Sequence, residues 1–290
     1  MQERLSCRRS DNRVQWLLPR SKIDWRPISK ICEWAILTPS NAFAYFPLKS
    51  LRVPIPEINM TSPENRLLAR LPPLQHGRLL KLCEWVDLNL NDVLLEAGEA
   101  LPYVYFPTDG FISVVTRMDG KPVLEVGMIG AEGMLGAQLA LGRVPLESLH
   151  PVVQGAGHAW RMPAAIFERE LARSAALRRV VYSYLQVTMS QLATSAACLR
   201  FHKIEPRLAR WLLMTQDRAH SKTFEVTHEF LAFMLGMRRV GITTAAAAFQ
   251  RRGMIKYSRG VLTVLNRREL LSSACSCYAE DRKTYNRLLA

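Results

Sequence analysis

The stretch "EFLAFMLGMRRVGITTAAAAFQRRGMIKYSRG", residues 229–260, decides the fold prediction for this chain. Within it, Ala232, Gly236 and Ile242 stand at the spacing A-x3-G-x5-I. A small residue lets two helices approach closely, a glycine makes the sharp turn between them, and a branched apolar residue fixes the second helix to the core. The spacing therefore predicts a helix-turn-helix motif.

The sequence on either side supports this motif. Thr227 suits the N-cap of the first helix, and Gly236 supplies the left-handed residue that ends it. After the second helix, residues 254–257 and 261–265 are predicted to form two strands around a Ser-Arg-Gly turn. A hairpin in this place is a wing, so we expect a winged helix-turn-helix domain over residues 202–272, which opens with an amphipathic helix, "IEPRLARWLLMTQDRA".

Such a motif places its second helix in the major groove of DNA, with the N-terminal side chains at the base edges. Arginine suits the N7 and O6 atoms of guanine, and the methyl groups of valine and threonine suit thymine. Cationic side chains on and before the wing suit phosphates. The predicted DNA-binding residues are Thr227, Arg238, Arg239, Val240, Thr243, Thr244, Arg251, Lys256 and Arg259. The alternative is a set of exposed arginines with no role in DNA binding.

The charge is distributed unevenly along the chain. The net charge is +14, but residues 60–200 carry 13 Lys and Arg against 13 Asp and Glu, whereas residues 201–290 carry 16 against 7. A neutral middle suits a small or uncharged ligand, and a basic C-terminal third suits a polyanion.

Length and composition exclude several classes of protein. The 290 residues suffice for two folded units, and no run approaches the roughly 20 apolar residues that a membrane span needs. The N-terminus has no signal-peptide pattern, and the six cysteines contain no C-x-x-C pair. We therefore expect a cytoplasmic protein with no membrane partner.

Short apolar runs punctuated by glycine fill residues 85–163. Asp109-Gly110 and Asp119-Gly120 are hairpin signals, and "GFISVVTRMDGKPVLEVG" is typical of strand, turn and strand. Regularly spaced short strands predict a double-stranded β-helix, or jelly roll, as an effector domain over residues 60–172. The fold class is therefore α+β.

A long helical pattern follows, from Phe167 to about Ala197, with apolar or small residues at alternating spacings of four and three. This heptad-like seam favours a partner helix, and so a homodimer joined through residues 173–201. The alternative is a helix packed on its own domain. The seam consists of Leu177, Val181, Leu185, Thr188, Leu192, Ser195 and Leu199.

The two ends of the chain give weaker signals. Residues 1–59 show no period, and we expect a disordered extension there; residues 273–290 form a C-terminal tail. In that tail Cys275 and Cys277 could bind metal or sense oxidation, but a C-x-C pair with no nearby histidine is more often incidental. We therefore predict no metal site and no cofactor.

The order of jelly roll, long helix and winged helix-turn-helix resembles the Crp/Fnr superfamily of bacterial transcription regulators, over about residues 62–278. The most specific text is "LRFHKIEPRLARWLLMTQDRA", the helix-turn-helix with its wing, and "ACSCY". The resemblance implies a cyclic-nucleotide-binding-like sensor, a dimer on a palindromic operator, and contact with RNA polymerase if the protein is an activator. It assigns base reading to Arg239, Val240 and Thr244. Most members carry Glu in place of Val240, so the usual half-site does not carry over.

The sensor departs from the family pattern. In cyclic-nucleotide binders a Gly-Glu pair is followed along the chain by an arginine that neutralises the phosphate. Here Glu132-Gly133 stands in roughly the place of that pair, but "SLHPVV" stands where the arginine should be. An unpaired buried phosphate is costly, so we expect no tight cyclic-nucleotide binding and leave the effector unknown. The cysteine cluster of the family's oxygen sensors is also missing, because Cys7, Cys32 and Cys83 are far apart.

Two other classes of function are the alternatives to a DNA-binding regulator. A cupin-like metalloenzyme needs several histidines on facing strands, and only His150 and His158 lie in the sheet region. No Ser/His/Asp or Cys/His arrangement stands out either, so we expect no enzyme activity. The second class is a ligand-binding or scaffolding module whose helix-turn-helix no longer contacts DNA.

Overall fold

The computed structural model describes residues 64–95, 98–116, 123–142 and 149–289. The predictions for residues 1–59 and for the Asp119-Gly120 turn lie outside these ranges. The helices are η2 (Leu68–Arg70), α1 (Pro73–Leu80), η3 (Ala137–Leu141), α2 (Ala164–Arg173), α3 (Ala175–Phe201), α4 (Ile204–Ala219), α5 (His228–Met234), α6 (Arg239–Arg251), α7 (Arg267–Ser273) and α8 (Cys277–Leu289). The strands are β1 (Glu84–Leu88), β2 (Tyr103–Thr116), β3 (Leu124–Ile129), β4 (Leu149–Pro163), β5 (Thr223–Glu225), β6 (Ile255–Ser258) and β7 (Val261–Val264).

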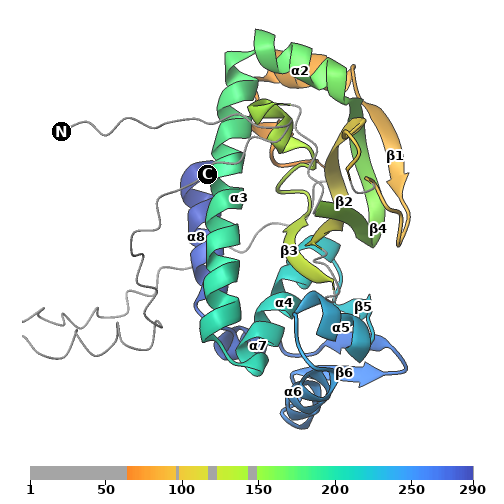
Figure 1. Cartoon of the computed structure of the whole chain (residues 1–290), viewed down its shortest axis with the longest axis vertical. Helices are drawn as coiled ribbons and strands as arrows, with labels where there is room; N and C mark the ends of the chain where they lie inside the picture. Colours follow the sequence, from red (N-terminus) through yellow and green to blue (C-terminus); the bar gives the residue numbers. More distant parts are fainter. Residues whose placement is uncertain (1–63, 96–97, 117–122, 143–148, 290) are drawn as a thin grey trace, which may run out of the picture. The chain divides into compact units, whose positions relative to one another are not determined.

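The predicted α+β class is confirmed, with an antiparallel β domain, a long helix and a C-terminal helix-turn-helix (Figure 1). The jelly-roll domain contains a four-stranded antiparallel sheet of order β1-β4-β2-β3. The strands predicted on either side of residues 117–122 are present, since β2 and β3 pair from Ile112↔Ile129 to Thr116↔Leu124.

The hairpin predicted at Asp109-Gly110 is wrong. Both residues lie inside β2, where the pairing with β4 shifts register around Asp109 and Phe111. Gly110 has φ +73°, and a Cβ there would collide with the carbonyl of Gly155 on β4. The dipeptide therefore marks a bulge in a long strand, which needs the same left-handed glycine as a turn.

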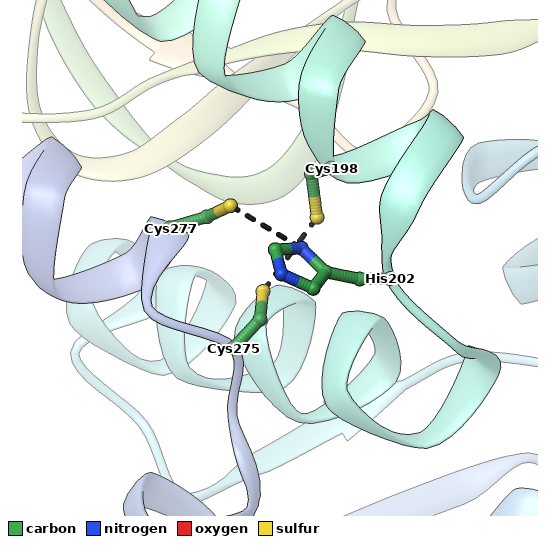
Figure 2. A group of neighbouring side chains, drawn as sticks. All are labelled: Cys198, His202, Cys275 and Cys277. Atoms are coloured by element: carbon green, nitrogen blue, oxygen red, sulfur yellow. Dashed lines mark hydrogen bonds between the residues drawn. The ribbon is translucent and has the colours of Figure 1, made fainter. Parts of the chain in front are cut away.

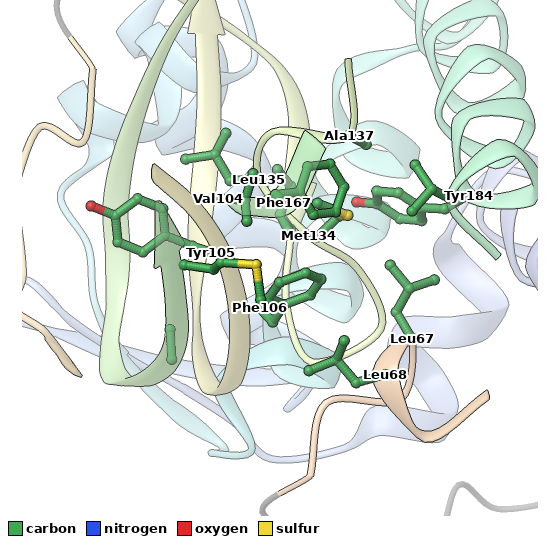
Figure 3. Close-up of a cluster of buried hydrophobic side chains, with 14 of the residues drawn as sticks. Leu67, Leu68, Val104, Tyr105, Phe106, Met134, Leu135, Ala137, Phe167 and Tyr184 are labelled. Atoms are coloured by element: carbon green, nitrogen blue, oxygen red, sulfur yellow. The ribbon is translucent and has the colours of Figure 1, made fainter. Parts of the chain in front are cut away.

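The core of the β domain lies between the sheet and helices α2 and α3 (Figure 3). Phe106 from β2 and Phe167 from α2 are completely buried and their ring centroids lie 6.4 Å apart. Tyr184 of α3 is also buried in this cluster, against Gly133. One face of α3 is therefore occupied by its own domain.

The helix predicted from Phe167 to Ala197 is two helices. Ser174 has an extended backbone and separates α2 from α3, and its hydroxyl accepts a hydrogen bond from the N–H of Leu177 at 3.1 Å. Serine is a favoured N-cap, so it starts the second helix where the heptad pattern predicted continuity.

Helix α8 runs beside α3 (Figure 1). Leu289 is buried in the core of the β domain, and the hydroxyl of Tyr285 donates to the carbonyl of Glu132 at 2.8 Å. Asp281 forms a buried ion pair with Arg210 of α4, at 2.6 Å. The segment predicted as a tail is thus an integral helix.

A second sheet, of order β5-β7-β6, completes the C-terminal domain. Helix α4 matches the predicted amphipathic helix, residue for residue. The predicted wing strands are β6 and β7, which pair from Ile255↔Val264 to Ser258↔Val261. Strand β5 joins this sheet through β7.

Among the described residues no single helix is long and apolar enough to cross a membrane. Helices α5 and α6 reach that composition only as a pair, and they are bent by 112° to each other.

Candidate DNA-binding surface

Helices α5 and α6 form the predicted helix-turn-helix. The Thr227 hydroxyl caps α5 by accepting from the N–H of Phe230 at 3.1 Å, and Gly236 ends the turn with φ +58°. Ala232 and Ile242 are buried in the core of the C-terminal domain. The 112° angle lies in the range of about 90 to 120° that is typical of helix-turn-helix pairs.

The first turn of α6 is the most exposed part of the motif. Arg238 is the N-cap residue, Arg239 begins the helix, and Val240 is 70% exposed. Thr243 and Thr244 follow on the same exposed side, with hydroxyls that donate to the carbonyls of Arg239 and Val240. The structure therefore brings these five predicted DNA-binding residues together, including Arg239, Val240 and Thr244, to which the resemblance assigns base reading.

The wing is fixed to α6 through His228, a contact that the sequence did not reveal. The ring of His228 stacks on Tyr257 of β6 with centroids 4.3 Å apart, and its Nδ1 lies 3.1 Å from the Thr243 hydroxyl. Burial lowers the pKa of His228, and the nearby Arg239 lowers it further. The imidazole thus joins α5, α6 and the wing as a neutral group, as expected for a packed histidine.

Gly241 lies inside α6, where glycine is unfavourable, and it faces the start of α4. A Cβ at this position would stand 2.6 Å from Cδ1 of Ile204, at the start of α4. A larger residue would have to displace only this end of the Ile204 side chain, so the contact accounts for little of the cost of about 1 kcal/mol that glycine carries inside a helix.

The predicted phosphate contacts occupy two places. Lys256 and Arg259 are exposed on the wing, where Arg259 has φ +50° at the tip of the β6–β7 turn. Arg251 ends α6, about 18 Å along the helix from Arg239 at 1.5 Å per residue. Arg252 is turned to α7 and donates to the Ser273 hydroxyl at 3.2 Å.

A scan of protein-family models matches part of the chain. Residues 206–272 match the Crp-like helix-turn-helix domain family. These residues form a Crp-like helix-turn-helix domain. The match spans most of α4, the α5–α6 motif, the wing and most of α7, so the Crp-like domain contains all nine residues predicted to bind DNA.

Solved structures show the same fold over most of the chain. A Crp/Fnr-family transcriptional regulator from Eubacterium rectale has a TM-score of 0.57 at 18% identity, and the match covers 72% of this chain and 98% of that one. FixK2 from Bradyrhizobium japonicum has a TM-score of 0.56 at 13% identity, and the match covers 67% of this chain and 98% of that one. The c-di-GMP-responsive regulator CLP from Xanthomonas campestris has a TM-score of 0.55 at 14% identity, and the match covers 67% of this chain and 99% of that one. No curated protein matches the chain. The chain therefore shares the fold of these three regulators, and the Crp-like domain lies in its C-terminal part.

The place where cyclic-nucleotide binders of the family hold their ligand is occupied in this chain by the protein's own residues. The carboxylate of Glu132 forms a salt bridge with Arg218 of α4 at 2.7 Å, and both side chains are largely buried. Gly133 faces the hydroxyl of Tyr184. The segment from Leu149 to Val153, where the family has its arginine, pairs with β2 as part of β4. Glu132 is thus used to join the β domain to the Crp-like domain.

The predicted helix seam is placed on two sides of α3. Leu177 and Val181 are 2% and 0% exposed and belong to the core of the β domain, so the prediction that they face a partner helix is wrong. Leu185 packs partly against the same core. The Thr188 hydroxyl donates to Tyr184, and Ser195 accepts from Arg210 of α4.

Of the predicted seam residues, only Leu192 and Leu199 are exposed apolar side chains. They belong to another row of side chains along α3. Tyr182 is 45% exposed, Met189 68%, Leu192 47% and Leu199 39%. With half-buried Leu185 and exposed Ala196, they alternate at spacings of three and four. We call Tyr182, Leu185, Met189, Leu192, Ala196 and Leu199 the exposed seam.

Glu125 of β3 contacts both the β domain and α4 of the Crp-like domain. Its carboxylate accepts hydrogen bonds from the Ser113 hydroxyl at 2.5 Å and from Nε1 of Trp211 on α4 at 3.0 Å. Burial raises the pKa of Glu125 from 4.5 to about 7, against these hydrogen bonds and the more distant Arg218 and Arg210. The junction between the β domain and the Crp-like domain therefore contains a carboxyl group that titrates near neutral pH.

Glu125 should make the stability of this junction pH-dependent. Because the pKa is raised on folding, its contribution is complete below pH 4.5 and is lost as the pH rises to about 7. Over that interval the free energy of unfolding should fall by about 1.4 kcal/mol per pH unit from this group. Glu125→Gln should remove that slope, which denaturant unfolding between pH 5 and 8 would measure. Parallel curves for the two proteins would contradict the assignment.

Proposed function

We propose that this chain is a homodimeric transcription regulator that binds a palindromic operator through its Crp-like domain. The observation that carries the proposal is the exposed first turn of α6, with Arg238, Arg239 and Val240 beside a basic wing. On this proposal residues 60–172 are the effector domain, 173–201 the dimerisation helix and 202–272 the DNA-binding domain, and residues 273–290 are the C-terminal segment that contains α8. RNA polymerase is a further partner if the regulator is an activator.

The division of roles follows from the geometry of the motif. Arg239 projects from the first turn of α6, where a second helix in the major groove meets base edges. Lys256 and Arg259 on the wing suit backbone phosphates, which carry no sequence information. The hydroxyl of Thr227 is occupied as a cap acceptor but keeps its proton, so it suits a phosphate oxygen as a donor.

Two arginine substitutions should fail in different ways. Arg239→Ala should lose a bidentate contact and cost about 1 to 3 kcal/mol of discrimination at one symmetric pair of base positions. Arg259→Ala should weaken all sequences alike and reduce the salt slope by about one unit. The assay is affinity against a library of single-base operator variants at two salt concentrations.

Lys81→Ala is the matched control for this experiment, because Lys81 is an exposed cation next to α1, outside the Crp-like domain. It should behave as wild type. Identical specificity profiles for wild type and Arg239→Ala would reject the docking of α6 in the groove. Wild type that binds no sequence in this library or in genome-wide mapping would favour the scaffolding alternative.

Cyclic AMP should not change the DNA affinity of the protein. Glu132 is held by Arg218, Gly133 is covered by Tyr184, and the segment that should hold a cationic partner for the phosphate is paired as strand. A cyclic phosphate placed there would be buried without compensation, which is costly. Calorimetric titration of the dimer should show no binding, and binding at micromolar cyclic AMP would contradict this account.

A further inference from the structure

Four side chains of metal-ligand type meet where α3 ends. Cys198 lies in the last turn of α3 and His202 is its C-cap residue, whereas Cys275 and Cys277 flank the turn between α7 and α8 (Figure 2). All four ligand atoms lie within 4.8 Å of one another. The sequence prediction of an incidental C-x-C pair without a nearby histidine is therefore wrong in its premise, since His202 is close in space.

The distances within this group fit one tetrahedral ion. Cys198 Sγ and Cys275 Sγ are 3.6 Å apart, and Cys277 Sγ and His202 Nδ1 are 3.5 Å apart. With Zn–S near 2.3 Å and Zn–N near 2.0 Å, the edges of a tetrahedron are about 3.8 Å for S–S and about 3.5 Å for S–N. The four atoms are too close together to enclose a cluster of several irons.

The burial and the types of the four side chains also fit a tetrahedral metal ion. Cys198, Cys275 and Cys277 are 2%, 8% and 6% exposed, and of the cysteines that the structure describes only Cys83 lies elsewhere. Thiols are weak hydrogen-bonding groups, so gathering three of them around one imidazole gives little stability in itself. Soft thiolates with imidazole in tetrahedral geometry are the ligands typical of zinc.

The surrounding charge also suits the bound form. Three thiolates, one neutral imidazole and Zn²⁺ sum to one negative charge, and the guanidinium groups of Arg207 and Arg210 interact with these cysteines. Arg207 donates to the Leu235 carbonyl and forms no salt bridge within the described ranges.

We propose that Cys198, His202, Cys275 and Cys277 bind one Zn²⁺ ion in a closed, structural site. Four protein ligands leave no open position for a substrate or an activated water, which separates structural from catalytic zinc. The ion would tie the end of α3 to the start of α8, at the two-residue break, His202 and Lys203, through which the chain enters the Crp-like domain. Part of its binding free energy would then stabilise the fold.

The test is metal analysis of the full chain purified without chelator. We expect one equivalent of zinc per chain in wild type and in Cys83→Ser, the control cysteine outside the group, and none in Cys275→Ser or Cys277→Ser. Removal of the metal from wild type should lower Tm by on the order of 10 °C. Affinity should fall as the pH is lowered, because protons compete for the ligands.

A second measurement keeps the proposal testable if the serine variants do not fold. Wild type stripped of metal and titrated with Co²⁺ should show the intense visible bands of a tetrahedral ion and thiolate-to-cobalt charge transfer, saturating at one equivalent. Weak bands of octahedral Co²⁺, or purified wild type without metal that contains a Cys198–Cys275 disulfide by mass spectrometry, would overturn the proposal. Iron in place of zinc at one equivalent would overturn the assignment of the ion.

Discussion

Leu192→Glu is expected to yield monomers that no longer bind the operator tightly. Leu192 is exposed near the middle of the exposed seam, so a twofold axis along α3 would bring both copies of the new carboxylate into one apolar interface. Burying unpaired charges there should cost at least about 3 kcal/mol, which weakens dimerisation by more than about 100-fold. Sedimentation velocity and operator binding would measure the two effects.

The matched control is Ala197→Glu, which adds the same charge at an exposed position of α3 beside the seam. It should remain a dimer. Because Leu192 is not part of the protomer core, the melting of the Leu192→Glu monomer should remain cooperative. A Leu192→Glu protein that stays dimeric would remove the exposed seam from the interface.

Asp281→Ala is expected to lower the free energy of unfolding by about 3 to 5 kcal/mol, because it leaves the buried guanidinium of Arg210 without its carboxylate. The two side chains are only 10% and 8% exposed and lie 2.6 Å apart. Denaturant unfolding at neutral pH would measure the loss.

Two further variants test whether the loss of stability comes from the unpaired charge of Arg210. Glu84→Ala breaks the more exposed pair with Arg161 and should cost at most about 1 kcal/mol. The double variant Arg210→Met and Asp281→Leu removes both charges and should recover most of the stability. An Asp281→Ala protein as stable as Glu84→Ala would show that Arg210 does not depend on this carboxylate.

The parts of the fold that local sequence determines were predictable. The Crp-like motif follows from short-range requirements, a cap at Thr227, a left-handed glycine at 236 and a branched residue at 242, which all act within a few residues. Local signals misled where one residue suits two structures. Gly110 fits both a hairpin and a bulge, and Ser174 is an ordinary polar residue until its hydroxyl is seen to cap α3.

The remainder depended on contacts between distant segments. The predicted seam included residues from the wrong face of α3, because the sequence does not say which face of this helix its own domain covers. The burial of Val181 identifies the covered face. The Cys/His group unites residues 75 positions apart, a distance over which spacing rules for metal ligands have no force. The contact between His228 and Tyr257 is hidden in the same way.

Helix α8 has a consequence for how the chain acquires its structure. Tyr285 bonds to the carbonyl of Glu132 across 153 positions, and Leu289 fills a core made largely of residues synthesised long before it. Contacts of such long range slow folding, because the loop between them must close before they stabilise anything. During synthesis the β domain would therefore emerge with part of its core uncovered, and it would mature only after the DNA-binding segment and α8 had followed. A fragment that stops after α3 should accordingly be prone to aggregate, and domain-by-domain dissection would misjudge the stability that the β domain has in the whole chain.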